Sequence, residues 1–147
     1  MPLPLHTPLP SLEGITEWIN CEPVLDEAQN NPILIYFWAM SCLHCHQNMP
    51  KVRSFHNQFT PQGLRMIAIH CPRMKTDTDI QKVKNAVKEY GIVEPCGIDN
   101  LHKTKQAFDN HIWPSFFLFD DDATLKMRSA GQSGLSMLEP VIKKLLD

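Results

Sequence analysis

The segment from Ile33 to Pro50, ILIYFWAMSCLHCHQNMP, constrains the fold of this chain more than any other. It starts with an uninterrupted β-branched and aromatic run over 33–38, which is typical of a strand covered on both faces. Two cysteines, Cys42 and Cys45, then open a stretch with helical spacing. A helix N-terminus stabilises a thiolate, because unpaired N–H groups and the helix dipole favour negative charge there. The segment therefore predicts a buried strand that leads into a redox-active cysteine pair.

The composition fits one folded domain and argues against several classes of partner. The 147 residues are 43% hydrophobic and 20% charged, which is enough for a substantial core in a single domain spanning 1–147. The net charge of -2 provides no basic surface for nucleic acid or an anionic membrane. Residues 1–14 form a proline-rich lead-in without the regions of an export signal, so we expect a cytoplasmic protein. Five cysteines favour a catalytic or metal-binding pair over a disulfide scaffold.

The hydrophobic pattern predicts alternating strands and helices, followed by an antiparallel hairpin. The predicted strands cover 15–19, 33–38, 64–70, 92–98, 116–119 and 124–130, and the fourth of them is expected at a sheet edge. The predicted helices cover 42–59, 77–90, 101–110 and 136–146, with a helical turn over 24–29. Either Asp99 or Asn100 is expected to cap the third helix. This order predicts an α/β fold with a central mixed sheet flanked by helices on both faces.

Two motifs of the chain resemble those of the thioredoxin superfamily. FWAMSCLHCHQNMP is similar to its FWA-x-x-C-x-x-C-x-x-x-x-P signature, and WPSFFLFDDDATL is similar to its cis-proline segment. The inserted elements between Leu64 and Phe116 resemble the TlpA/ResA-like branch, and AIHCPR and AGQSGLSMLE resemble YkuV-type thiol-disulfide oxidoreductases. The resemblance implies a thioredoxin fold with a TlpA/ResA-like N-terminal extension and central insertion. It also implies an enzyme that exchanges disulfides with protein substrates without a cofactor or a bound metal.

The resemblance implies a role for each motif residue. Cys42 is the expected nucleophile and the exposed, more acidic thiol, and Cys45 is the buried resolving thiol that attacks the mixed disulfide. Pro114 is expected to follow a cis peptide bond, and Trp113 either shapes the substrate groove beside it or belongs to the core. His44 either supports the Cys42 thiolate, which would make the disulfide more oxidising, or faces solvent with a minor effect.

Several residues near the cysteines depart from the thioredoxin pattern. Tyr36 stands six residues before the first cysteine, where thioredoxin carries a buried aspartate that accepts the proton of the resolving thiol. Ser41 stands in place of a tryptophan, and Leu43 stands where many relatives carry proline. A neutral phenol is not a base near pH 7, so the proton acceptor is water or another group, for which Glu94 is a candidate.

Other interpretations of the cysteine pair remain open. In a reducing cytosol a monomeric enzyme would reduce its substrates and depend on an upstream reductase, whereas an oxidant or isomerase is the alternative. The letters CLHCH also match the C-x-x-C-H attachment motif of c-type haem. A zinc site could instead use Cys42, Cys45, His44 and His46. Among the other cysteines, Cys71 at a strand end is a candidate redox-sensitive thiol.

Overall fold

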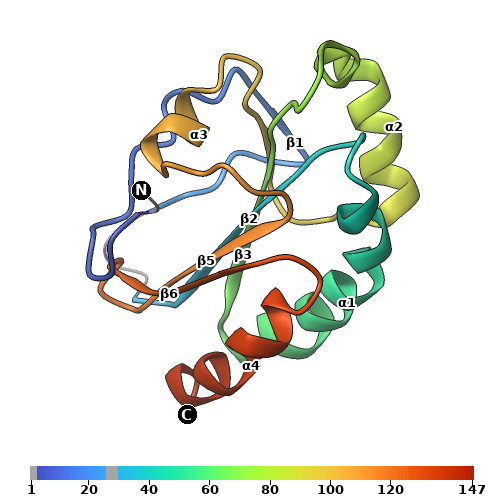
Figure 1. The fold of residues 1–147 in the computed structure, drawn as a ribbon. Helices are drawn as coiled ribbons and strands as arrows, with labels where there is room; N and C mark the ends of the chain where they lie inside the picture. Colours follow the sequence, from blue (N-terminus) through green and yellow to red (C-terminus); the bar gives the residue numbers. More distant parts are fainter. Residues whose placement is uncertain (1–2, 26–29) are drawn as a thin grey trace.

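A six-stranded mixed sheet forms the centre of the computed structural model, which describes residues 3–25 and 30–147 (Figure 1). The strands are β1 (Glu17–Ile19), β2 (Ile33–Trp38), β3 (Arg65–His70), β4 (Cys96–Ile98), β5 (Ser115–Phe119) and β6 (Leu125–Ala130). Their order across the sheet is β1-β4-β3-β2-β5-β6. β2, β3 and β4 are parallel, while β1, β5 and β6 each run antiparallel to their neighbours. The predicted mixed α/β sheet is confirmed.

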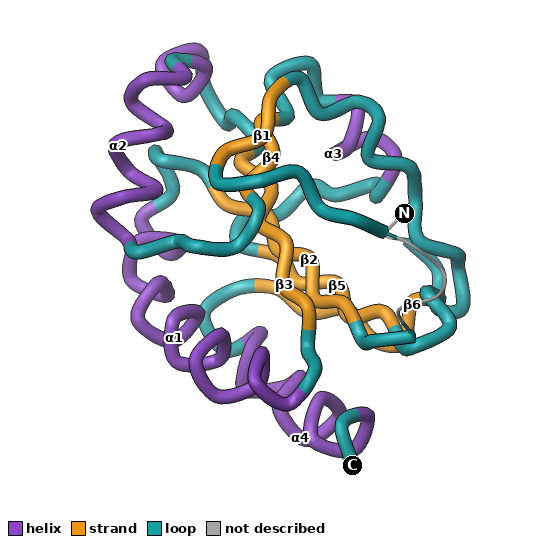
Figure 2. The backbone as a smooth tube through the Cα atoms, turned by 180° about the vertical axis from the view of Figure 1, so that it is seen from behind, coloured by secondary structure: helices purple, strands orange, loops and turns teal. Residues whose placement is uncertain are grey.

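Helices cover both faces of the sheet (Figure 2). The helices are α1 (Leu43–Phe59), α2 (Ile80–Tyr90), α3 (Lys103–Ala107) and α4 (Gly134–Leu145), with 3-10 turns η2 (Thr60–Gln62) and η3 (Lys75–Thr78). One core cluster joins α1, α2 and α4 to the sheet, and a second lies on the opposite face under α3 and the N-terminal segment. In the described part of the chain, no helix is long and apolar enough to cross a membrane.

The central strand β2 is buried on both faces, as its unbroken apolar sequence predicts. Leu34, Tyr36 and Trp38 belong to the cluster under α1, whereas Ile35 and Phe37 belong to the cluster on the other side. β3 and β5 flank it on its two edges. Full burial of such side chains contributes about 1.5–3 kcal/mol each, so β2 is a rigid base for the cysteine segment that follows it.

The segment between β3 and β5 differs from the sequence prediction at three places, of which the first two concern α2 and β4. The helix predicted over 77–90 begins instead at Ile80, because Asp77 lies in the 3-10 turn η3 and its carboxylate accepts hydrogen bonds from outside the helix. Asp79 caps α2 by accepting the N–H of Lys82 at 3.2 Å. The fourth strand is not at the edge, since β1 pairs with its outer side.

The helix predicted over 101–110 is reduced to Lys103–Ala107. Backbone conformation limits it at both ends, because His102 has a φ of 59° and Asp109 a φ of 48°, which are left-handed. The N-cap is His102 and not Asp99 or Asn100, the two residues predicted, but the carboxylate of Asp99 accepts the first-turn N–H groups of Thr104 at 2.9 Å and Lys105 at 2.8 Å.

The two ends of the chain pack against the hairpin of β5 and β6. In the lead-in, the N–H of His6 donates to the carbonyl of Leu125 at 2.8 Å, and a bridge joins Pro8 to Thr124. α4 begins at Gly134, earlier than predicted, where a Cβ would lie 2.7 Å from the ring of Phe116, so glycine permits this close approach. The helical turn predicted over 24–29 falls largely on residues 26–29, which lie outside the described residues.

Candidate active site

A disulfide joins Cys42 and Cys45 where β2 leads into α1, with their Cα atoms 5.2 Å apart. Cys42 is the N-cap of the helix, and its Sγ accepts the N–H of Cys45 at 3.1 Å. Cys45 lies within the first turn of α1 and faces the core. The Cys42 sulfur therefore occupies the position where free helix N–H groups stabilise negative charge.

Cys42 is not the exposed thiol that the sequence predicts. Both cysteines are 2% exposed in this disulfide form. Met40 and Trp113 are partly buried and pack against the core cluster that contains the pair.

The loop 39–41, just before the nucleophile, is held by residues of the central insertion. The N–H of Met40 donates to Nε2 of His70 at 3.2 Å. Ser41 donates twice to Asp77, from its N–H to Oδ1 at 3.1 Å and from its Oγ to Oδ2 at 2.7 Å. The same carboxylate accepts the N–H of Arg73 at 3.0 Å. Asp77 and His70 are therefore site residues that sequence reasoning missed, since no local motif marks a contact made across the fold.

The charge states of His70 and Asp77, which hold the loop 39–41, follow from their surroundings. Burial lowers the pKa of His70 to about 4, with Asp77 opposing the shift, so His70 is neutral and its Nε2 accepts at neutral pH. Burial alone would raise the pKa of Asp77, but hydrogen bonds from Ser41 and from the backbone of Arg73 and Met74 hold it below its ordinary value. The loop thus rests on a neutral imidazole and an ionised carboxylate.

The histidines of the CLHCH segment have separate partners. Nε2 of Gln132 lies 2.9 Å from Nδ1 of His44, and Nδ1 of His46 lies 2.7 Å from the hydroxyl of Tyr90. With both cysteine sulfurs in the disulfide, these four side chains do not form the zinc arrangement considered above. Among the described residues, the group whose possible ligand atoms lie within 4.8 Å of one another is 120–122, at the β5–β6 turn.

The Trp113–Pro114 peptide bond is cis, as expected. The indole of Trp113 donates to the carbonyl of Cys71 at 3.0 Å and remains partly exposed, and Nζ of Lys105 lies 5.9 Å from its ring centre. The carbonyl of Pro114 accepts the N–H of Gly131 at 2.9 Å. Trp113 packs against both core clusters and so lies between the cysteine site and the opposite face of the sheet.

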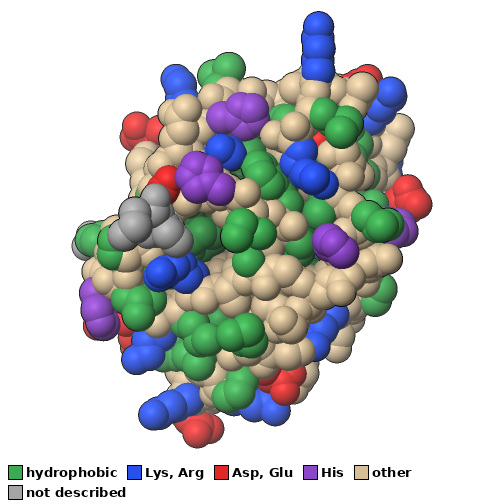
Figure 3. Space-filling model, viewed as in Figure 1, with side chains coloured by type: hydrophobic (Ala, Val, Ile, Leu, Met, Phe, Trp, Pro, Cys, Tyr) green, Lys and Arg blue, Asp and Glu red, His purple; other side chains and the backbone are tan. Residues whose placement is uncertain are grey.

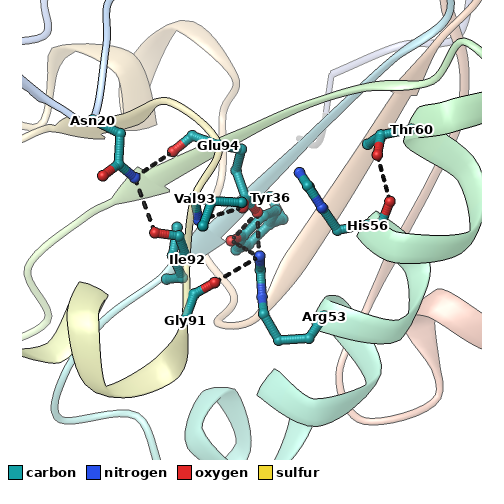
Figure 4. A network of polar contacts seen from close by, with 9 residues as sticks. All are labelled: Asn20, Tyr36, Arg53, His56, Thr60, Gly91, Ile92, Val93 and Glu94. Carbon is teal, nitrogen blue, oxygen red and sulfur yellow. Dashed lines mark hydrogen bonds and ion pairs between the residues drawn. The ribbon is translucent and has the colours of Figure 1, made fainter.

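Tyr36 is part of a buried polar network with Glu94 and Arg53 (Figure 4). The Tyr36 hydroxyl donates to Oε2 of Glu94 at 2.7 Å, and Arg53 forms an ion pair with the same oxygen. Oε1 of Glu94 accepts the N–H of Val93 at 3.2 Å. Burial opposes ionisation, yet the bonds from Arg53 hold the pKa of Glu94 below its ordinary value. A carboxylate stabilised in this way is a weak base, which argues against Glu94 as the proton acceptor for Cys45.

The remaining cysteines differ in exposure. Burial, assisted by Asp99, raises the pKa of the Cys71 thiol, and burial raises that of Cys96 to about 12. A buried, protonated thiol is inert, so Cys71 does not fit the predicted redox-sensitive site. Cys21 is the exposed free thiol of the described residues.

Comparisons with known proteins agree with this site. Residues 9–128 match the model of the AhpC/TSA family. Thiol-disulfide oxidoreductase YkuV of Bacillus subtilis (strain 168) is 35% identical over 143 residues, covering 97% of this chain and 96% of the relative. Thiol-disulfide oxidoreductase ResA of Bacillus anthracis is 27% identical over 121 residues, covering 82% of this chain and 67% of the relative.

The solved structures agree as well. A solution structure of a thioredoxin-like protein in the oxidised form superposes with a TM-score of 0.86 and 34% identity, over 98% of this chain and 97% of that one. A crystal structure of a thioredoxin-like superfamily protein, SPOA0173, gives a TM-score of 0.80 at 23% identity, which supports the fold alone. A thioredoxin-like fold, a cysteine pair at disulfide distance and this coverage lead to one conclusion. The chain belongs to the AhpC/TSA family of thioredoxin-like proteins and is a thiol-disulfide oxidoreductase.

Proposed function

We propose that this enzyme reduces disulfides in protein substrates through the Cys42–Cys45 couple. The observation that carries the proposal is the position of the Cys42 sulfur, which caps α1 and accepts the N–H of Cys45. That bond stabilises a thiolate on Cys42, and the thiolate is the species that attacks a disulfide.

The proposed reaction moves two electrons and two protons to the substrate. The Cys42 thiolate attacks one substrate sulfur, the substrate S–S bond breaks, and the other substrate sulfur leaves and takes a proton. Cys45 then loses its proton and attacks Cys42, so the mixed disulfide breaks and the second substrate thiol is released. The enzyme is left with the Cys42–Cys45 disulfide, which an upstream dithiol reductase returns to the reduced form.

Trp113 and Pro114 are the proposed substrate-binding residues. Trp113 packs against the cluster that contains both cysteines while part of its ring is exposed, which suits a side chain that lines the approach to the disulfide. Basic, acidic and hydrophobic side chains are interspersed over the face seen in Figure 3. That face therefore has no strong single-sign field to select highly charged substrates.

The proposed compartment is the cytoplasm and the proposed state is a monomer. Three cysteines, Cys21, Cys71 and Cys96, are free thiols, which suits a reducing compartment. The disulfide, its loop supports and the Trp113–Pro114 segment all come from one chain, so the site is complete without a second copy.

The proposal is tested by insulin-disulfide reduction with dithiothreitol as the electron source. Cys42→Ser is expected to lower turnover to the rate of dithiothreitol alone, whereas Cys21→Ser, a matched change of a free exposed thiol, is expected to retain wild-type turnover. Turnover retained in Cys42→Ser would overturn the assignment.

The alternative direction is substrate oxidation. It is favoured by one observation, the presence of His44 between the two cysteines, since a positive charge beside the nucleophile stabilises the reduced form. The equilibrium of the couple with glutathione distinguishes the two directions, because reductants and oxidants of this fold differ by about 100 mV or more.

A further inference from the structure

The indole ring of Trp113 is held in place at the cysteine site. Its Nε1–H donates to the carbonyl of Cys71 at 3.0 Å, and the ring packs against the core cluster that contains Cys42 and Cys45. The side chain of Trp113 is nevertheless partly exposed. A fixed and partly exposed aromatic ring offers a surface on which part of a bound substrate can lie.

Helix α3 places a cation against this ring. Nζ of Lys105 lies 5.9 Å from the centre of the Trp113 ring, within the range in which an ammonium group is attracted to the face of an indole. The backbone of Lys105 is also fixed, because its N–H donates to the buried carboxylate of Asp99 at 2.8 Å. The ammonium of this long side chain is therefore kept near the ring.

The charge of Lys105 has no carboxylate partner among the described residues. The ion pairs in that part of the chain use other cations, namely Arg53, Lys84, His111 and Lys143. Asp99 lies close to the backbone of Lys105, but it is buried and its two oxygens accept the N–H groups of Thr104 and Lys105. The ammonium donors of Lys105 thus remain available on a side chain that is partly exposed.

We propose that Lys105 is a specificity residue of this enzyme, which binds an acidic side chain next to the disulfide cysteine of the substrate. The proposal rests on the proposed function, in which the substrate lies along Trp113 and Pro114, and it names the substrate class. The substrate carboxylate accepts a hydrogen bond from the Lys105 ammonium while the neighbouring cysteine meets Cys42. The contact is local, so it favours a single acidic residue at the cysteine over a basic one and does not require a highly charged substrate.

The test uses three disulfide-bonded peptides that differ only in the residues flanking their cysteines, which are glutamate, glutamine or lysine. The rate constant for reduction of each peptide by the reduced enzyme is measured by chromatography of the peptide. The wild type is expected to reduce the glutamate peptide about fivefold faster than the lysine peptide at low salt, with the glutamine peptide between them. High salt should decrease this preference, because it screens a partly exposed charge pair.

Substitutions of Lys105 assign the preference to its charge. Lys105→Met keeps an apolar chain against the ring but removes the charge, so the preference should disappear while the glutamine peptide reacts at the wild-type rate. Lys105→Arg should keep the preference, and Lys105→Glu should reverse it. Lys103→Met, which removes an exposed lysine of the same helix, is the matched control and should keep it. The intrinsic reactivity of each peptide is common to all variants and cancels when their preferences are compared.

The outcomes separate this inference from the proposed function. If all three peptides are reduced but the wild type shows no preference, or if Lys105→Met or Lys103→Met changes the preference as little or as much as the other, the inference is overturned and the proposed function stands. Slow reduction of the glutamine peptide by Lys105→Met would show a structural role for Lys105 and would also overturn the inference. A wild-type enzyme that reduces none of the peptides would overturn the proposed function, and the inference with it.

Discussion

Substitution of Arg53 by methionine tests the buried network behind the disulfide helix. Arg53 lies on α1, and its guanidinium bonds the carboxylate of Glu94 and the carbonyl of Gly91 at 3.1 Å. The side chain of Glu94 is 2% exposed, and that of Arg53 is 18% exposed. Methionine keeps much of the apolar stem but removes the charge, so Glu94 remains as a buried carboxylate without its cation.

The expected loss of unfolding free energy at pH 7 is about 3 kcal/mol, at the lower end of the range for breaking a buried ion pair. It is not larger, because the Tyr36 hydroxyl and the Val93 N–H still donate to the carboxylate. Glu94→Gln should cost less, about 1–2 kcal/mol, because the partly exposed guanidinium that it strands can reach water. The double variant should cost less than the sum of the two, since it leaves no unpaired charge.

The loss also depends on pH, with a sign that follows from Glu94. In the wild type its pKa is below the ordinary 4.5, so its stabilisation is complete above pH 4.5 and disappears as the pH falls through the folded-state value. In Arg53→Met, burial without a cation raises the pKa above that of the unfolded chain. The carboxylate then destabilises the fold at neutral pH and ceases to do so once it is protonated. The difference in unfolding free energy between the wild type and Arg53→Met must therefore be smaller at pH 4 than at pH 7.

Urea denaturation of the oxidised proteins, followed by circular dichroism at pH 7 and pH 4, measures this gap. Other titrating groups, His70 included, are common to both proteins and cancel in the difference. A deficit of the same size at both pH values, or one below about 1 kcal/mol at pH 7, would refute the assignment of an ionised Glu94 held by Arg53.

Three further predictions concern the supports of the site and its free thiols. The pKa of His70 is about 4 in the fold against an ordinary 6.5, so its contribution to stability, at most about 3 kcal/mol, is complete above pH 6.5 and is lost as the pH falls toward 4. The free energy of unfolding measured in urea should therefore rise less from pH 4 to pH 6.5 in His70→Asn than in the wild type. Asp77→Asn offers one acceptor oxygen in place of two, so the rate of insulin reduction should fall about tenfold. Ser41→Ala removes only the 2.7 Å bond from its hydroxyl to Asp77 and should lower the rate less, and equal effects of the two substitutions would contradict this ordering. Iodoacetamide should alkylate Cys21 in the oxidised native protein and leave Cys71 unmodified until urea unfolds it, which peptide mass spectrometry would show; modification of Cys71 in the native protein would contradict its burial.

The elements with local signals were predictable from the sequence. The unbroken apolar run of β2 and the cysteine pair at the start of α1 stand next to each other in the chain, and a short local pattern is enough to recognise each of them. The bonds from the start of α3 to the carboxylate of Asp99 are also local, and Asp99 was one of the two residues expected there, although the N-cap itself is His102.

Contacts between distant segments could not be predicted in the same way. The bond from Ser41 to Asp77 spans 36 positions, and the contact from Gln132 to His44 spans 88. Each depends on the three-dimensional arrangement of loops that have no periodic pattern. The burial of Cys42 in the disulfide is also a property of the fold, because the core cluster that contains it is made of residues from several distant elements.

The central claim is that Cys42 attacks the disulfide of the substrate and Cys45 resolves the product. The most direct measurement is peptide mass spectrometry of reduced Cys45→Ser after reaction with a disulfide-bonded peptide, because loss of the resolving thiol leaves the mixed disulfide in place. We expect one peptide adduct, linked to Cys42. An adduct at Cys21 instead, or a Cys42 thiol that stays free, would contradict the assignment.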